Sequence, residues 1–217
     1  MDPLDLVRSV AHGSVCLACN DTVVYVDPYH MEEDLHDADL VVITHGHADH
    51  YSPEDIKKVM KDDTCFATTE EISRRLQVEI GINDDYISEL SCEAPTAVFE
   101  CGVMVTPVIA ENERHNIRSG FGAVVELEGV KVYFSGDTDV LAEGAACDIL
   151  FVCCDGVYNM PGVEKDILNG VLAMDDKPGL VIPYHYGEAE VPGSGQNGAR
   201  VVAALTAAGI PAKEWQD

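Results

Sequence analysis

Short, continuous apolar runs of strand length constrain the fold of this chain more than any other feature of its sequence. Residues 40–44 form such a run, and similar runs span residues 148–154 and 180–182. Runs of this kind are typical of strands buried on both faces, as in parallel sheets covered by helices. They are much shorter than the roughly 18–20 apolar residues that a transmembrane helix needs, so we expect no membrane association.

Helix signals alternate with these strands. Ser52 and Pro53 predict a helix start, because a hydroxyl accepts a free N–H of the first turn and proline fits its first position. The further helices are predicted at residues 69–76, 164–174 and 199–208, and the further strands at residues 15–26 (two strands around a turn), 64–67, 103–109, 121–127 and 130–134. Two similar halves of alternating strands and helices predict an α/β layered fold in one domain over residues 1–217.

The charge balance narrows the expected partners. The 217 residues include 39 acidic and 13 basic ones, which gives a formal net charge of −26. Nucleic-acid affinity comes largely from Lys and Arg, so we expect no nucleic-acid partner, although a bound metal could still attract a small anionic substrate. The first residues lack a basic segment followed by an apolar stretch, so we expect no secretory signal and a cytoplasmic protein. A homo-oligomer is compatible with the sequence.

Four candidate metal ligands lie within six residues, directly after the strand predicted at residues 40–44. They are His45, His47, Asp49 and His50. Imidazole nitrogens and carboxylate oxygens together suit zinc, iron and manganese. Four such donors exceed what one catalytic ion uses while it keeps a position open for substrate. The cluster therefore predicts two divalent ions, with zinc as the first choice and manganese or iron as alternatives.

Two later segments place one more candidate ligand each after an apolar strand. Asp137 follows the strand at residues 130–134, and His185 follows residues 180–182. Taken alone, each has an ordinary interpretation, as a turn aspartate or as a histidine at a strand end. Their order after the histidine cluster favours a shared site, because polar residues at the carboxyl ends of strands commonly meet in α/β folds.

This order resembles the metallo-β-lactamase superfamily, whose signature H-x-H-x-D-H is followed by a His, an Asp and a final His. The resemblance spans essentially the whole chain and implies a four-layer αββα sandwich. The segments that carry it look like a short, insertion-free branch that includes ascorbate-6-phosphate lactonase-like Zn-dependent hydrolases. They are residues 11–14, 25–29, 44–50, 135–138 and 182–186.

The resemblance also implies a role for each candidate ligand. His45 and His47 would bind the first metal, and Asp137 would bridge the two ions. The second metal would be bound by Asp49, His50 and His185.

Further roles and one departure follow from the same resemblance. Asp27 would orient a ligand histidine by accepting its other N–H, and His12 would lie near the pocket. The third histidine of the family pattern is missing, because Asn112 stands at its place. His115 is the candidate substitute. The alternative is that His115 is a solvated loop residue, in which case the first metal would bind weakly or be absent.

The ligand set predicts a metal-dependent hydrolase. A metal-bound hydroxide would attack an ester, lactone or phosphodiester bond of a small molecule. Asp49 and Asp137 would hold the nucleophile, and a metal or His12 would stabilise the charged intermediate. Alternatives are a phosphodiesterase or nuclease of the same fold, and a non-catalytic metal-binding regulatory protein, for which Asn112 is the one hint. An oxygen-reducing di-iron relative would carry Glu at the position of His47.

Overall fold

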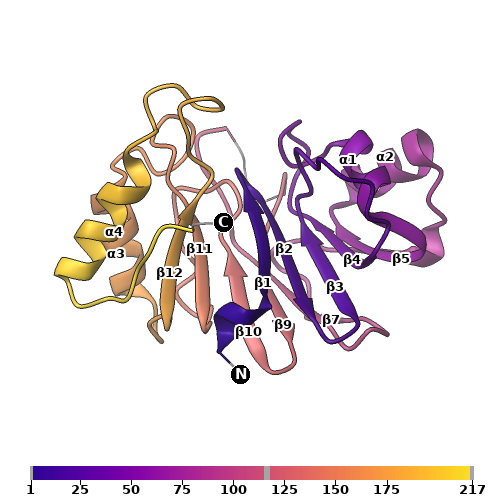
Figure 1. Cartoon of the computed structure of the whole chain (residues 1–217), viewed down its shortest axis with the longest axis horizontal. Coiled ribbons are helices and arrows are strands. Elements are labelled where there is room, and N and C mark those ends of the chain that lie inside the picture. The colour runs from indigo at the N-terminus through magenta and orange to yellow at the C-terminus, as the bar shows by residue number, and fades with distance from the viewer. Residues whose placement is uncertain (1, 115–117, 216–217) are drawn as a thin grey trace.

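The computed structural model describes residues 2–114 and 118–215. Within these residues the strands form two six-stranded sheets (Figure 1). In order across the first sheet these are β1 (Val7–Ala11), β2 (Ser14–Cys19), β3 (Thr22–Val26), β4 (Ala38–Ile43), β5 (Met60–Thr68) and β6 (Ile87–Glu89). The second sheet runs from β12 (Leu180–Tyr184) through β11 (Ile149–Cys153), β10 (Val130–Phe134), β9 (Gly122–Leu127) and β8 (Met104–Val108) to β7 (Ala97–Val98).

Two pairs of helices cover the outer sides of the sheets. Helices α1 (Pro53–Val59) and α2 (Glu70–Arg75) lie beside the first sheet, and α3 (Glu164–Ala173) and α4 (Asn197–Ala207) lie beside the second (Figure 1). The layers therefore run helix, sheet, sheet, helix. This is the four-layer αββα sandwich that the sequence resemblance implied. None of the helices in the described residues combines the length and apolarity needed to cross a membrane.

Strand β4 is buried on both faces, which explains the continuous apolar run in its sequence. Leu40 and Val42 pack in a core cluster that also includes residues of the second sheet, whereas Val41 and Ile43 pack with side chains of α1 and α2. All four side chains are 0% exposed. Full burial of such a side chain contributes about 1.5–3 kcal/mol relative to exposure. Both faces of β4 are thus core, and a polar residue at any of these positions would be costly.

Local signals fix where the elements begin. The Ser52 side chain accepts the backbone N–H of Asp55, and Pro53 opens α1 as predicted. Two boundaries differ from expectation. Strand β5 begins at Met60, directly after α1, because Met60 pairs with Ala38; the charged residues 61–63 follow before Leu40 pairs with Cys65. Helix α2 ends at Arg75, and a short π-helical segment (Leu76–Ile80) continues it to Gly81.

Several short elements were not predicted. They are the edge strands β1, β6 and β7 and the 3₁₀ turns Pro3–Leu6 and Asp84–Tyr86.

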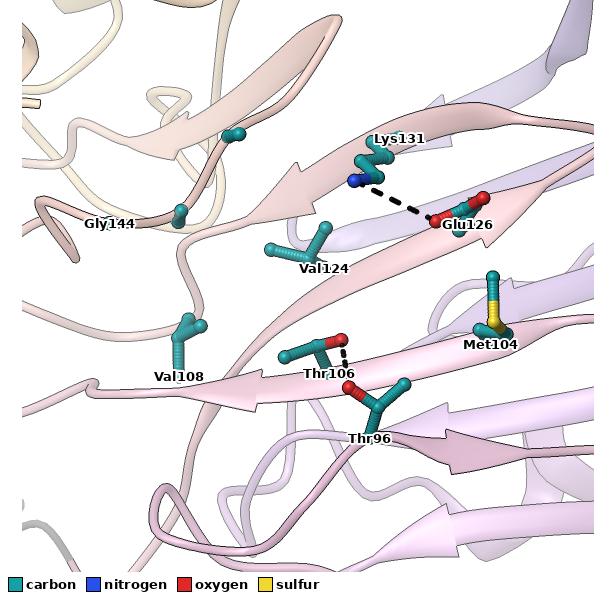
Figure 2. A pocket seen from close by; sticks show the side chains of 10 residues that line it. Thr96, Met104, Thr106, Val108, Val124, Glu126, Lys131 and Gly144 are labelled. Atoms are coloured by element: carbon teal, nitrogen blue, oxygen red, sulfur yellow. Dashed lines mark hydrogen bonds and ion pairs between the residues drawn. The ribbon is translucent and has the colours of Figure 1, made fainter. Parts of the chain in front are cut away.

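The second sheet also carries a depression of about 300 Å³ that is distinct from the site described below. Met104 and Thr106 of β8 and Glu126 of β9 contribute to its wall (Figure 2). The ion pair of Lys131 with Glu126 (3.9 Å) and the hydrogen bond of Thr96 with Thr106 (2.8 Å) cross it. Glu126 is the one residue of this lining that could bind a metal, and its carboxylate is paired with Lys131.

Candidate metal centre

The carboxyl ends of strands in both sheets deliver the polar side chains of the candidate site. In the first sheet, His12 follows β1, Asp27 follows β3, and the segment from Thr44 to His50 follows β4. The second sheet contributes the residues that follow β10, β11 and β12, namely Asp137, Asp155 and His185. Strands β3 and β4 are parallel, as are β10, β11 and β12. These strand ends therefore lie side by side, as expected for sites in α/β folds.

The Asp137 carboxylate faces four histidines. Its Oδ1 lies 3.3 Å from His50 Nε2 and 3.2 Å from His185 Nε2. Its Oδ2 lies 3.7 Å from His45 Nε2 and 3.9 Å from His47 Nδ1. Three segments that are far apart in the sequence thus meet at one carboxylate.

Asp49 faces a second set of imidazoles. Its Oδ2 lies 3.3 Å from His185 Nε2, 3.4 Å from His12 Nε2 and 3.8 Å from His50 Nε2. Donor atoms close enough to share an ion fall into two groups, one of His45, His50 and Asp137 and the other of His12, Asp49 and His185. This grouping differs from the one that the resemblance implied, because His50 lies with His45 and because His12 joins the Asp49 group.

Six of the seven metal ligands expected from the sequence are brought together. His45, His47, Asp49, His50, Asp137 and His185 surround the same space. His115 lies outside the described residues. Asn112 lies at the cavity, where its Nδ2 donates to Asn159 Oδ1 at 2.6 Å and its Oδ1 accepts the N–H of Arg114 at 2.7 Å. Its carboxamide therefore organises the surrounding loops.

A hydrogen-bond chain fixes His45 and His50, two of the histidines that follow strands of the first sheet. Asp27 Oδ1 accepts the Thr44 N–H at 2.7 Å, and Asp27 Oδ2 accepts the Thr44 hydroxyl at 2.6 Å and faces His50 Nδ1 at 2.7 Å. Because the single hydroxyl proton goes to Asp27, Thr44 Oγ1 can only accept from His45 Nδ1, at 3.0 Å. We therefore assign the ring protons to Nδ1, which leaves both Nε2 lone pairs directed at the site.

Asp155 is the buried carboxylate that faces the rear of the His185 ring, and it was not identified from the sequence. Its Oδ2 lies 3.3 Å from His185 Nδ1, and its Oδ1 accepts the N–H groups of Val157 and Tyr158 at 2.8 and 2.6 Å. Asp155 is 1% exposed. A local signal for this role was present in the sequence, because Asp155 follows the fully buried strand β11, much as Asp137 follows β10.

Backbone strain concentrates at the same place. His12, Asp27 and His185 have φ values of 52°, 48° and 55°, in the left-handed region that non-glycine residues seldom adopt. The His185 N–H donates to the His12 carbonyl at 3.0 Å and so links the two sheets. A Cβ on Gly13 would lie 3.1 Å from both His50 Cε1 and His185 Cδ2. Such strain persists where the surroundings over-determine it, which is typical of functional sites.

The buried charges stabilise one another. Burial alone would raise the pKa of Asp137, but His185 and His50 hold it well below its ordinary value. Burial likewise opposes ionisation of Asp49, yet hydrogen bonding to His12 and His185 lowers its pKa. Burial would lower the pKa of His185, but Asp137, Asp155 and Asp49 raise it to about 9. Both carboxylates are therefore ionised and available as ligands at neutral pH.

The donor set fits a divalent cation. The Nε2 atoms of His50 and His185 lie 3.1 Å apart, and each lies 3.2–3.3 Å from Asp137 Oδ1. Two ligands of a tetrahedral zinc ion, each about 2.0–2.1 Å from it, are separated by about 3.3–3.4 Å. Asp137 Oδ1 is buried and has no hydrogen-bond partner within the described ranges. When the neighbouring imidazoles are neutral, a buried carboxylate oxygen in that state requires a compensating positive charge, which a divalent cation would supply.

A cavity of about 150 Å³ opens onto these ligands. Tyr158, of the segment 158–160, contributes to its lining, whereas the segment 187–198 contributes none of it. In that second segment, Ser194 is 0% exposed and its hydroxyl donates to the Val191 carbonyl at 2.8 Å. The cavity is lined by His47, Asp49, Asn112, Arg114, Asp137, Tyr158 and His185.

Comparison with known proteins identifies the family. A model of the beta-lactamase superfamily domain matches residues 19–156. The chain is 31% identical over 168 residues to a UPF0173 metal-dependent hydrolase of Archaeoglobus fulgidus, with 69% of this chain and 66% of that relative covered. The chain thus spans just under two thirds of that relative's length.

Solved structures share the fold. A crystal structure from Parabacteroides distasonis superposes with a TM-score of 0.76 at 23% identity and covers 96% of this chain and 91% of that one. Igni18, a metallo hydrolase of the archaeon Ignicoccus hospitalis, superposes with a TM-score of 0.74 at 20% identity and covers 97% and 94%. The matched domain, the ligand order and the αββα layers agree. The chain belongs to the metallo-β-lactamase superfamily.

Proposed function

We propose that this chain is a metal-dependent hydrolase that cleaves an ester, lactone or phosphodiester bond in a small molecule. The observation that carries the proposal is the convergence of His50 Nε2, His185 Nε2 and Asp137 Oδ1 within 3.1–3.3 Å of one another beside a cavity. The name of the Archaeoglobus fulgidus relative supports the same class of activity. We propose two ions, with zinc the first choice, because two groups of donors lie side by side.

The bound ions would supply an activated water, because a divalent cation such as zinc lowers the pKa of coordinated water to about 7. The side chains of the protein would position this water and stabilise the charges that develop around it. Asp137 and Asp49 stay ionised and hold their positions against the imidazoles. Asp49, whose side chain is 33% exposed, borders the cavity and can accept a hydrogen bond from a bound water there. His12 Nε2, 3.4 Å from Asp49, can stabilise charge that develops beside it.

A non-catalytic metal-binding role is the rival that one observation favours. Asn112 stands where the resemblance implied a histidine, and its carboxamide is hydrogen-bonded to Asn159 and Arg114. A phosphodiesterase acting on polynucleotides is disfavoured by the net charge of −26.

Metal content and turnover together separate these candidates. The purified chain should be analysed for zinc, manganese and iron per molecule and assayed with 4-nitrophenyl acetate, γ-butyrolactone and bis(4-nitrophenyl) phosphate. We expect two ions and hydrolysis of at least one substrate, with His47→Ala inactive but folded. His36→Ala is the matched control, because His36 is an exposed histidine bonded to the Met60 carbonyl. Bound metal without turnover would support the regulatory role instead.

A further inference from the structure

One arginine stands out among the basic residues of this acidic chain. Each of four of the six arginines pairs with a carboxylate at the surface, namely Arg8, Arg74, Arg75 and Arg200. Arg114 differs, because no carboxylate in the described part of the chain lies within ion-pair distance of its guanidinium. It lines the cavity over the metal centre instead. A positive charge is thus directed at the space that the substrate would enter.

The surroundings of Arg114 hold its guanidinium in place without neutralising it. Its Cζ lies 4.6 Å from the centroid of the Tyr158 ring, a cation–π contact. Its backbone N–H donates to Asn112 Oδ1 at 2.7 Å. A guanidinium stacked on an aromatic face keeps its N–H groups available in the plane, where they can bind a carboxylate or phosphate in bidentate fashion.

The Tyr158 ring, on which Arg114 lies, is connected to the metal centre through one residue, Asp155. Asp155 Oδ1 accepts the Tyr158 N–H at 2.6 Å, while Asp155 Oδ2 lies 3.3 Å from His185 Nδ1. The position of the ring under Arg114 is therefore set by the same carboxylate that orients a candidate ligand. This link gives the arginine a defined place relative to the reacting centre.

We propose that Arg114, stacked on Tyr158, binds an anionic group of the substrate, a phosphate or a carboxylate, beside the bond that the metal centre cleaves. The inference rests on the proposed hydrolase function for that bond, whereas binding of the anion can be measured separately. The cavity of about 150 Å³ is smaller than the roughly 300–1,000 Å³ of common ligand pockets, so the anchored substrate is small. Asn112 is then a positioning residue for Arg114.

Three small acids test this proposal. Each has one carboxylate followed by two methylene groups, and they differ only in the group at the other end. Butyrate ends in a methyl group, succinate in a second carboxylate and 3-phosphonopropionate in a phosphonate. Calorimetric titration of the zinc-loaded chain should show that one of the two dianionic acids binds about tenfold more tightly than butyrate, as expected for one charge-assisted contact. The tighter of the two identifies whether the substrate carries a carboxylate or a phosphate.

Variants assign the effect to the arginine. In Arg114→Gln the advantage of the dianionic acids should fall below twofold, while the affinity for butyrate stays unchanged. Arg114→Lys should keep part of the advantage, since it retains the charge but not the planar fork. Arg74→Gln is the matched control, because Arg74 is 68% exposed on α2 and pairs with Glu70; it should behave as the wild-type chain.

The possible results separate this inference from the hydrolase proposal. An advantage that survives in Arg114→Gln, or that is absent from the wild-type chain, overturns the role of Arg114 whether or not the chain hydrolyses any substrate. An advantage that depends on Arg114 in a zinc-loaded chain without hydrolytic activity supports anion binding and contradicts only the proposed hydrolase function.

Discussion

The Nε2 atoms of His50 and His185 lie 3.1 Å apart although the residues are separated by 135 positions in the sequence. Each ring is held from behind by a buried carboxylate, Asp27 for His50 and Asp155 for His185. Two nitrogen atoms that approach so closely, next to Asp137, form the centre of the candidate site.

Replacing Asp27 with Asn should weaken metal binding. The asparagine would keep one acceptor but turn an N–H₂ group either toward the Thr44 N–H or toward both His50 Nδ1 and the Thr44 hydroxyl, all of which donate to Asp27. Loss of such an orienting partner typically costs about 10–100-fold in metal affinity. Competition with a chromophoric chelator measures the change. Asp62→Asn, at an exposed position, should leave the affinity unaltered; equal affinities for the wild-type chain and Asp27→Asn would contradict the orienting role.

Replacing Gly13 with Ala should displace the two histidines. A Cβ there would lie 3.1 Å from His50 Cε1 and His185 Cδ2, closer than ordinary van der Waals contact. We expect about tenfold weaker metal binding, because sub-ångström displacement of ligands disturbs coordination, with folding retained. Gly144→Ala is the control, since a Cβ at that position meets nothing within 4 Å. If both alanine variants bind zinc as the wild type does, the close packing around Gly13 has no part in the site.

The metal-free chain should lose stability as the pH rises above neutrality. The pKa of His185 is raised from 6.5 to about 9 in the folded state, chiefly by Asp137 acting against burial. Its contribution is therefore fully present below pH 6.5 and is lost as the pH rises through about 9. The change should be on the order of 3 kcal/mol in the free energy of unfolding.

Urea unfolding with a chelator present, at pH 6, 7.5 and 8.5, measures this trend. His185→Gln should show a weaker decline over the same range. A wild-type unfolding free energy that is constant or rises between pH 6 and 8.5 would show that His185 is not charged in the folded metal-free chain.

Much of the architecture could be predicted from burial patterns. The apolar run that became β4 is core on both faces, and Ser52 caps α1 through the bond that its hydroxyl was expected to make. Asp137 and His185 follow their strands at the predicted places. These features are local, because a strand that is buried on both sides and a capped helix end each leave a pattern within a few residues.

Other features could not be predicted because they depend on tertiary contacts. Strand β1 is half-exposed and has no continuous apolar run, and β5 begins in a charged segment that only its pairing with β4 makes a strand. The left-handed backbone at His12 and its approach to Asp49 follow from the link between the two sheets. Asp155 has a local signal, but its role emerges only when β11 and β12 lie side by side.

Zinc content of the wild-type chain and of Asp137→Asn, measured by mass spectrometry after dialysis against zinc, tests the central claim most directly. The Asp137 carboxylate faces His45, His47, His50 and His185. We predict two equivalents of zinc in the wild-type chain and the loss of at least one in Asp137→Asn, with both chains folded. A wild-type chain that retains no zinc, or an Asp137→Asn chain that retains as much as the wild type, would contradict the account.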